Sequence, residues 1–352
     1  MKYLIYINIM TIFCIISSCF SQQNKTSSTI DKEWWDNLDD EWKNILLINQ
    51  NFSKQHVNIF KIQEEYMNRL KTKGEENYSE MNTSLRRLIQ EKEFGLSYYD
   101  FYARAIRTKH LTQNDTIIDL VNLKKLDVIY MINGPKDLTP LEKFPNLKVL
   151  IMNFFGSFYE PGKEVDIEPL RNLKELKILH CSSNKLKSLE PIKDLIQLEE
   201  LVCNNNYINT LTPLKKLKKL KKLSFSSKAK KLNIKTISQL DNLEELYLEI
   251  EKKVPNLSKL KKLKKLAISE SEMAVVDRRY WVKKIDFLEN LNNLEFLDLE
   301  MTSYRGSLNV LYNLKNIKAI TLPTFINSIT VKEFINKNKN CVIVNSYEFK
   351  PY

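Results

Sequence analysis

An internal repeat of 22 residues constrains this chain more than any other feature of its sequence. Residues 173–192 read LKELKILHCSSNKLKSLEPI, and residues 195–214 read LIQLEELVCNNNYINTLTPL. When the first segment is shifted by 22 residues, seven positions keep the same type of residue. These positions are Leu176, Leu179, Cys181, Asn184, Leu186, Leu189 and Pro191, which fall on Leu198, Leu201, Cys203, Asn206, Ile208, Leu211 and Pro213. Because a single repeat cannot cover its own inward leucines, the repeats must stack against one another to bury them.

The spacing of these residues matches L-x-x-L-x-L-x-x-N-x-L and resembles that of leucine-rich-repeat proteins. The L-x-P-L segments at 138–141, 167–170, 189–192 and 211–214 are similar to the 22-residue class of the internalins. The resemblance covers about residues 116–345 and implies an α/β fold, a solenoid whose strands form one curved parallel sheet. It places one inward strand residue in each coil, at Ile129, Leu150, Leu179, Leu201, Leu223, Leu246, Leu266, Leu297, Ile320 and Val342. The asparagine after the strand is expected to satisfy backbone groups of the turn.

The first residues resemble a bacterial lipoprotein leader. After Lys2, residues 3–16 are apolar, and this stretch of 14 residues is shorter than the roughly 20 that a membrane-spanning helix needs. The small residues before Cys19 resemble a lipobox, which implies a signal peptide over residues 1–18 and lipidation of Cys19. We therefore expect an exported protein with a tether over residues 19–30, anchored by lipid to a membrane and periplasmic or at the cell surface. The alternative is an ordinary secretory signal in which Cys19 plays no part.

Residues 31–115 lack the repeat and are expected to be helical. Apolar residues, tryptophans among them, recur every three or four positions between Trp34 and Ile45, which predicts an amphipathic helix. Further helices are predicted over 59–70 and 85–106. Because a solenoid needs its open end covered, this region is either a helical cap or small helical domain packed on the first coil, or an independent functional module. A short tail, residues 346–352, follows the solenoid.

The net charge of +12, from 55 Lys and Arg against 43 Asp and Glu, raises the question of an anionic partner. In the repeat frame, however, the charges form two columns across the strands in which the sign alternates. The first column is Lys177, Glu199, Lys221, Glu244, Lys264, Glu295 and Lys318, and the second is Glu200, Lys222, Glu245 and Lys265. Because adjacent strands lie about 4.8 Å apart, opposite charges should pair laterally, and we expect no nucleic acid partner. The lysines expected to lack such compensation are Lys215, Lys216, Lys218 and Lys219.

Alternation along each strand sends the neighbours of the inward leucine to the concave face, where leucine-rich-repeat proteins commonly bind proteins. Tyr130 and Ile151 then lie at an apolar end of this face, and Tyr247 lies in its polar middle. The apolar end is either an exposed interface or a surface that the N-terminal region covers. Two long repeats add two loops on the same side of the solenoid, rich in the side chains of binding hot spots. The loop candidates, which either bind a partner or close their own loops, are Phe154, Phe155, Phe158, Tyr159, Arg278, Arg279, Tyr280 and Trp281.

Little in the sequence supports catalysis. Three histidines and six glycines leave little material for a His-based site or a phosphate-binding loop, so we expect no catalytic, cofactor or metal site. His180 should point outward and Cys181 inward, so these neighbours are not expected to share a metal ion. Cys181 and Cys203 are expected to be free core thiols, because a disulfide between adjacent strands is usually strained.

The predicted function is therefore non-catalytic recognition of an unidentified protein, of a host or of the envelope, by a module displayed at the bacterial cell envelope. Recognition would use the concave face and the two loops. One alternative is an enzyme whose activity lies in the helical N-terminal region and whose repeats select the substrate. The other is a scaffold of the envelope.

Overall fold

The computed structural model of the chain describes residues 30, 32–43, 45–47, 49–50, 123–132, 135, 137–153, 164–229, 231–250, 254–271, 282–323, 326–338 and 341–343. The side chains of Tyr130, Ile132 and Asn153 are not part of this description. The predicted signal peptide, most of the tether, the helices at 59–70 and 85–106 and the tail lie outside these ranges, and the domain boundaries stay predictions. Within the described ranges, no helix is long and apolar enough to cross a membrane.

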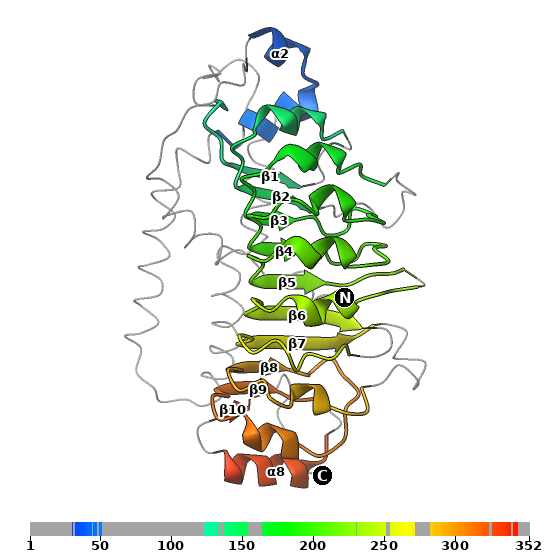
Figure 1. The fold of residues 1–352 in the computed structure, drawn as a ribbon, viewed down its shortest axis with the longest axis vertical. Coiled ribbons are helices and arrows are strands. Elements are labelled where there is room, and N and C mark those ends of the chain that lie inside the picture. The colour runs from blue at the N-terminus through cyan, green and yellow to red at the C-terminus, as the bar shows by residue number, and fades with distance from the viewer. Residues whose placement is uncertain are drawn as a thin grey trace, which may run out of the picture.

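Ten strands pair in parallel and in chain order to form one sheet, which confirms the predicted solenoid. Each coil adds one strand between those of its two neighbours (Figure 1). The strands are β1 (Val128–Ile132), β2 (Val149–Asn153), β3 (Ile178–His180), β4 (Glu200–Val202), β5 (Lys222–Phe225), β6 (Glu245–Ile250), β7 (Lys265–Glu270), β8 (Phe296–Asp298), β9 (Ala319–Thr321) and β10 (Val342–Ile343).

The register confirms the predicted strand positions from Ile129 to Ile320, which pair with one another from β1 to β9. The last position is wrong by one residue. Val342 pairs with Ala319 and is exposed, whereas Ile343 takes the place opposite Ile320. The physical reason is the return segment before β10, which is an α-helix of ten residues, so the 22-residue spacing no longer applies there.

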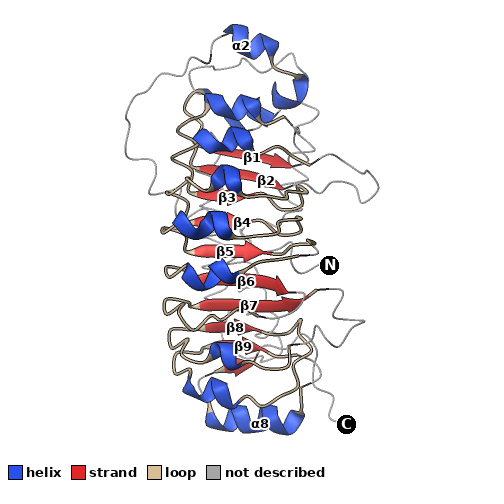
Figure 2. Cartoon of the chain, turned by 45° about the vertical axis from the view of Figure 1, so that its right-hand side comes forward, coloured by secondary structure: helices blue, strands red, loops and turns tan. Residues whose placement is uncertain are grey.

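Most coils return through a short 3-10 helix, and these helices stack beside the strands (Figure 2). In the first four, the proline of L-x-P-L occupies the first turn, where its fixed φ is compatible with the helix and no N–H is needed. The 3-10 helices are η1 (Thr139–Lys143), η2 (Glu168–Asn172), η3 (Glu190–Ile192), η4 (Thr212–Lys216), η5 (Lys235–Gln239), η7 (Asp286–Leu288) and η8 (Asn309–Asn313).

The inward residues form one hydrophobic core that runs the length of the solenoid. Each fully buried leucine contributes about 1.5–3 kcal/mol relative to an exposed one, and a coil obtains this burial only from its neighbours. Asn206 confirms the predicted role of the turn asparagine. Its amide donates to the carbonyls of Cys181 (3.0 Å) and Cys203 (3.1 Å), and its Oδ1 accepts from the backbone N–H of Asn184 (3.0 Å).

The two ends of this core are capped by helices. At the N-terminal end, α2 (Lys32–Asn37) is followed by further helical residues from 40 onward, and Trp35 and Trp42 join the same core as the first coil. The Trp42 indole donates to the carbonyl of Asp137 (2.9 Å). The predicted single helix is interrupted at Leu38, because Asp39 accepts a hydrogen bond from the backbone N–H of Trp42 (2.7 Å) and so caps a new helical segment.

At the C-terminal end, α8 (Ser328–Lys337) lies against the last coils (Figure 1). Its N-cap is Asn327, whose side chain accepts from the backbone N–H of Ile329 (2.8 Å). The ring of Phe334 stacks on that of Tyr312, with ring centroids 6.0 Å apart. Together with residues 32–50, this helix closes the described core at both ends.

Candidate functional site

The candidate site lies on the face of the sheet opposite the core, which we call the concave face. Val149, Ile151 and Ile178 form a hydrophobic cluster of their own there, separate from the main core, because strand alternation sends them away from it. Of the predicted site residues, Ile151 is 7% and Tyr247 is 6% exposed, so each is almost covered. Whether they contact a partner stays a prediction, as it does for Tyr130.

Exposure changes sharply along the concave face. From β2 to β6 the outward side chains of the strands are largely buried, and Ile178 and Ser224 are 0% exposed. From β7 to β9 most outward side chains contact solvent, and Asp298 is exposed. We call the first group the covered section: Val149, Ile151, Ile178, His180, Glu200, Val202, Lys222, Ser224 and Tyr247. We call the second group the open section: Ala267, Phe296, Asp298 and Thr321.

A row of paired polar side chains crosses the concave face from β3 to β7, and its charges alternate in sign from β4 to β7. His180 Nε2 lies 2.8 Å from Glu200 Oε1, and Lys222 Nζ lies 3.8 Å from that oxygen and 3.5 Å from Glu245 Oε2. Lys265 pairs with Glu245 at 2.8 Å and ends the row. This confirms lateral pairing in the second predicted column. The part of His180 was missed, although its place one strand from Glu200 follows from the repeat frame.

Burial and pairing act in opposite directions on Glu200. Burial by itself would raise the pKa of this carboxyl group. The positive charge of Lys222 and the hydrogen bond from His180 outweigh burial and hold the pKa of Glu200 below its ordinary value of 4.5. Pairing with Lys222 and His180 thus offsets the cost of burying this carboxylate.

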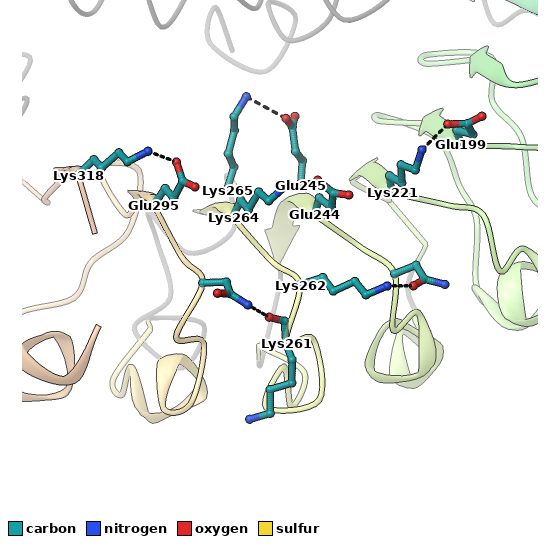
Figure 3. A network of polar contacts seen from close by, with 12 residues as sticks. Glu199, Lys221, Glu244, Glu245, Lys261, Lys262, Lys264, Lys265, Glu295 and Lys318 are labelled. Atoms are coloured by element: carbon teal, nitrogen blue, oxygen red, sulfur yellow. Dashed lines mark hydrogen bonds and ion pairs between the residues drawn. The ribbon is translucent and has the colours of Figure 1, made fainter. Parts of the chain in front are cut away.

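The first predicted column, at the edge of the sheet, also forms ion pairs (Figure 3). Its lysines reach back to the acid of the preceding coil, as Lys221 does to Glu199 and Lys264 to Glu244, both at 2.7 Å. Lys318 pairs with Glu295 in the same way. The column is thus a series of separate pairs.

One expectation for the return segments is wrong. Lys216 was expected to lack compensation but lies 2.9 Å from Asp194 of the preceding coil. Lys216 belongs to η4, which lies beside η3 of the preceding coil, so this lysine extends toward an acid of the preceding coil as the lysines of the first column do. Lys219 likewise donates to the Gln197 side chain, and Lys218 lies 3.5 Å from the carbonyl of Gln239.

The aromatic and arginine candidates of the two loops lie outside the described residues, but the ends of both loops are described. Residues 154–163 follow β2 and residues 272–281 follow β7, so we call them the β2 insert and the β7 insert. Both leave the carboxyl end of a parallel strand, and therefore the same edge of the sheet.

Each insert is tied to the next coil by one glutamate. Glu164 lies at the end of the β2 insert. Its carboxylate accepts a hydrogen bond from the backbone N–H of Lys187 (3.0 Å) and forms an ion pair with the ammonium group of the Lys187 side chain (2.8 Å). Glu270 closes the β7 insert, because its carboxylate accepts from the backbone N–H of Val282 and from the hydroxyl of Ser303. Sequence reasoning missed both glutamates, whose only signal is their position beside an insert.

Cys181 and Cys203 are free core thiols, as predicted. Burial raises the pKa of the Cys181 thiol to about 12 and that of Cys203 well above its ordinary value. Both are therefore unreactive parts of the core. Among the described residues, no group of three or more potential ligands is arranged to hold a metal ion.

Comparison with known proteins gives a family and a set of related folds. A sequence model of the family described as leucine-rich repeat region matches residues 113–338. An internalin from Listeria monocytogenes is 21% identical, with 67% of this chain and 78% of the internalin covered and a TM-score of 0.46. A leucine-rich-repeat protein from Leptospira interrogans is 20% identical, with coverages of 58% and 56% and a TM-score of 0.44. No curated protein matches the chain significantly.

Proposed function

Because the chain belongs to the leucine-rich-repeat family, we propose that it is a non-catalytic module that binds another protein through its concave face and two inserts. The observation that carries this proposal is the placement of the inserts. Both leave the same edge of one rigid sheet, and Glu164 and Glu270 tie their ends to the coils that follow. Loops held on a rigid scaffold are the usual carriers of binding residues.

The spacing of the inserts indicates the size of the partner. The β2 and β7 strands are five strand positions apart, which corresponds to about 24 Å across the sheet. A partner that contacts both inserts must extend across this width. A folded protein, which buries about 800 Å² of its own surface in a specific interface, is large enough to do so. This favours a folded protein over a short peptide.

The charges of the concave face support binding over chemistry. Glu200 and Lys222 form an ion pair and His180 hydrogen-bonds to Glu200, so these side chains are engaged with one another before any partner arrives. A general acid or base needs a proton-transfer group directed at a substrate atom. These side chains instead give the face a fixed charge pattern, which contributes to specificity more than to raw affinity.

Capture of a partner tests the binding proposal. The mature chain, immobilised by its C-terminus, is exposed to envelope and host-cell proteins, and specifically retained proteins are identified by mass spectrometry. We expect a retained protein to be lost when Tyr280 and Trp281 are both changed to Ala, since aromatic anchors commonly contribute 2 kcal/mol or more. The matched control is Ile196→Ala, an exposed apolar residue on a return segment. Equal retention by both variants would contradict the proposal.

The proposed location at the bacterial envelope has its own test. Lipidation of Cys19 would anchor the chain to a membrane, and a Cys19→Ala variant would lose that anchor. We expect the wild-type chain to fractionate with membranes and to incorporate a labelled fatty acid, and the variant to do neither. Membrane fractionation of the variant would show that another feature holds the protein there.

A further inference from the structure

Lysines gather along one edge of the solenoid, at the amino ends of the strands. In the segment before each strand from β1 to β9, two solvent-facing positions lie between two buried apolar residues. Eight lysines and two acids, Glu175 and Asp241, occupy these positions, and all eight lysines are exposed. The lysines, which we call the lysine edge, are Lys124, Lys125, Lys174, Lys218, Lys219, Lys261, Lys262 and Lys315.

The lysine edge follows the stacking of the coils. Its members recur in every second coil, directly before β1, β3, β5, β7 and β9. Because adjacent strands lie about 4.8 Å apart, successive groups of lysines are about 10 Å apart and the edge extends over about 38 Å. The coils between them place one acid, Asp241, at the same positions. The result is an extended array of positive charge.

The partners of the lysines before β5 and β7 are neutral. Lys261 Nζ lies 3.2 Å from the backbone carbonyl oxygen of Asn290, and Lys262 Nζ lies 2.7 Å from Asn242 Oδ1. The two lysines before β5 likewise contact a carbonyl and a side-chain amide oxygen. Within the part of the chain that the structure describes, none of these four lysines forms an ion pair. A neutral acceptor holds an ammonium group in place but leaves its charge uncompensated.

The first column of ion pairs lies beside the lysine edge and differs from it (Figure 3). Lys264, two residues after Lys262, pairs with Glu244 of the preceding coil at 2.7 Å. Lys221 pairs with Glu199 in the same way. Acids therefore alternate with lysines in the column nearer the strands, whereas at the lysine edge the alternate coils carry mainly neutral residues. The lysine edge thus keeps an excess of one sign of charge, which attracts anions.

The lysine edge and the two inserts lie at opposite edges of the sheet. All strands are parallel, so the residues that precede them share one edge, and the β2 and β7 inserts leave from the other (Figure 1). A surface bound at the lysine edge therefore leaves the ends of the inserts, at Glu164 and Glu270, unobstructed.

We propose that the lysine edge docks on the anionic headgroups of a lipid bilayer. Each basic side chain near an anionic membrane increases the affinity by about fivefold. The groups of lysines are separated by about 10 Å. Lipids diffuse laterally and can gather beneath each group, whereas an anionic polymer carries its charges at a fixed spacing that leaves many of them between the groups. This difference favours a membrane over a soluble polyanion.

The inference rests on the proposed location at the envelope and adds an orientation to it. Lipidation of Cys19 would hold the chain at a membrane but leave it free to turn, because the predicted tether over residues 19–30 is flexible. Docking of the lysine edge would fix the orientation, so that both inserts leave the sheet on the side away from the bilayer.

Cosedimentation with vesicles tests the proposal. The full mature chain carries Cys19→Ala, so that no lipid anchor contributes, and is mixed with phosphatidylcholine vesicles that contain either about one third phosphatidylglycerol or none. We expect binding to the anionic vesicles only, and we expect it to weaken as the salt concentration rises. Changing Lys218, Lys219, Lys261 and Lys262 together to Gln should weaken it at least about tenfold.

The matched control removes the same charge at the opposite edge, beside the same two strands. It changes to Gln four exposed lysines that follow β5 or the β7 insert, namely Lys228, Lys231, Lys283 and Lys284. Because these lysines would face away from the bilayer, we expect this variant to bind anionic vesicles within about twofold of the wild type.

A second measurement keeps all lysines in place. The Cys19→Ala chain is treated with an amine-reactive reagent in the presence and absence of anionic vesicles, and the modified lysines are identified by mass spectrometry. We expect the vesicles to slow modification of Lys218 and Lys261 at least about threefold and to leave Lys228 and Lys283 unchanged, because only the first two would lie against the headgroups.

Four results would overturn the proposal. They are undiminished binding by the variant of the lysine edge, equal losses in the two variants, equal protection of both edges, and tighter binding to soluble polyphosphate than to anionic vesicles at the same phosphate concentration. The last would assign the lysine edge to a polymer. Partner capture through the inserts and lipidation of Cys19 are measured without these vesicles, so failure of this inference is distinguishable from failure of the proposed function.

Discussion

The covered and open sections of the concave face share a backbone and differ in what surrounds their side chains. In the covered section, apolar residues and a row of paired charges are removed from solvent; in the open section, Asp298 and Thr321 hydrogen-bond to each other within reach of water. The repeat sets the direction in which a side chain points. Its exposure depends on the side chains around it, which differ from coil to coil.

The same contrast separates two kinds of ion pair. Lys222 lies between Glu200 and Glu245 with 4% of its side chain exposed, whereas Lys264, paired with Glu244, is 51% exposed. An exposed pair contributes about 0.2–1 kcal/mol, because water screens it. Removing one partner of a buried pair costs about 3–5 kcal/mol, because the remaining charge is left unpaired in a desolvated place.

The largest effect is therefore expected from Lys222→Met. Methionine keeps the length of the side chain but leaves Glu200 and Glu245 without their shared cation. We expect the free energy of unfolding, measured by urea denaturation, to fall by about 3–5 kcal/mol. The matched Lys264→Met substitution should cost less than about 1 kcal/mol. If both variants lost similar amounts of unfolding free energy, the buried and exposed ion pairs would contribute equally to stability, contrary to this expectation.

Substitutions at the two inserts are expected to have effects of intermediate size. Glu270→Ala removes the carboxylate that holds Val282 and Ser303, and hydrogen bonds to a charged group contribute about 1.5–3 kcal/mol. We expect tryptic cleavage of the native protein after Arg278 and Arg279 to become at least about tenfold faster, because local opening becomes easier.

Glu164→Ala should act in the same way on cleavage after Lys163, at the insert beside the covered section. Glu199→Ala is the control, since it breaks a pair between coils that is remote from either insert. If Glu199→Ala accelerated cleavage of the inserts as strongly, the effect would be one of general stability, and the glutamates would not be specific ties.

The smallest expected effect is a change in acid stability. The pKa of Glu200 is lowered in the folded chain, so ionisation of this group stabilises the fold above its ordinary value of 4.5. That contribution is lost as the pH falls through the folded pKa. We expect Glu200→Gln, although less stable at neutral pH, to lose less of its free energy of unfolding than the wild type between about pH 5 and pH 3.

Glu168→Gln is the exposed counterpart in this experiment. The hydrogen bond from Arg171 also lowers the pKa of Glu168, but its carboxyl group lies in solvent. Its substitution should therefore change the pH dependence of unfolding much less. If Glu168→Gln changed the pH dependence of unfolding more than Glu200→Gln, burial of Glu200 would not increase the contribution of its ionised form to stability.

Much of the solenoid was predictable from the sequence, because every repeat has inward apolar residues that only stacking on the next repeat can bury. The strand positions from Ile129 to Ile320 followed from the spacing of leucines, and the spacing of charges indicated that opposite charges on adjacent strands pair, although not which neighbouring acid each lysine reaches. The errors lie where the repeat ends or is interrupted. Because α8 forms the last return segment, the last inward residue is Ile343 and not Val342. The predicted N-terminal helix is interrupted because Asp39 caps a new helical segment.

The candidate site was less predictable. The sequence indicated which residues point toward the concave face, but not that Ile151 and Tyr247 are almost covered. It marked where the inserts leave the sheet, but Glu164 and Glu270 carry no pattern of their own. Their partners, Lys187 and Ser303, are neighbours only after the coils have stacked.

By itself, the sequence determined that this chain winds into stacked parallel strands and which side of each strand enters the core. It could do so because a period of 22 residues brings each leucine beside its equivalent in the next coil. Only the tertiary structure decided which outward side chains meet solvent, which acid each lysine reaches, and how the inserts are tied. These depend on distances between atoms that are remote along the chain, and local spacing does not set such distances.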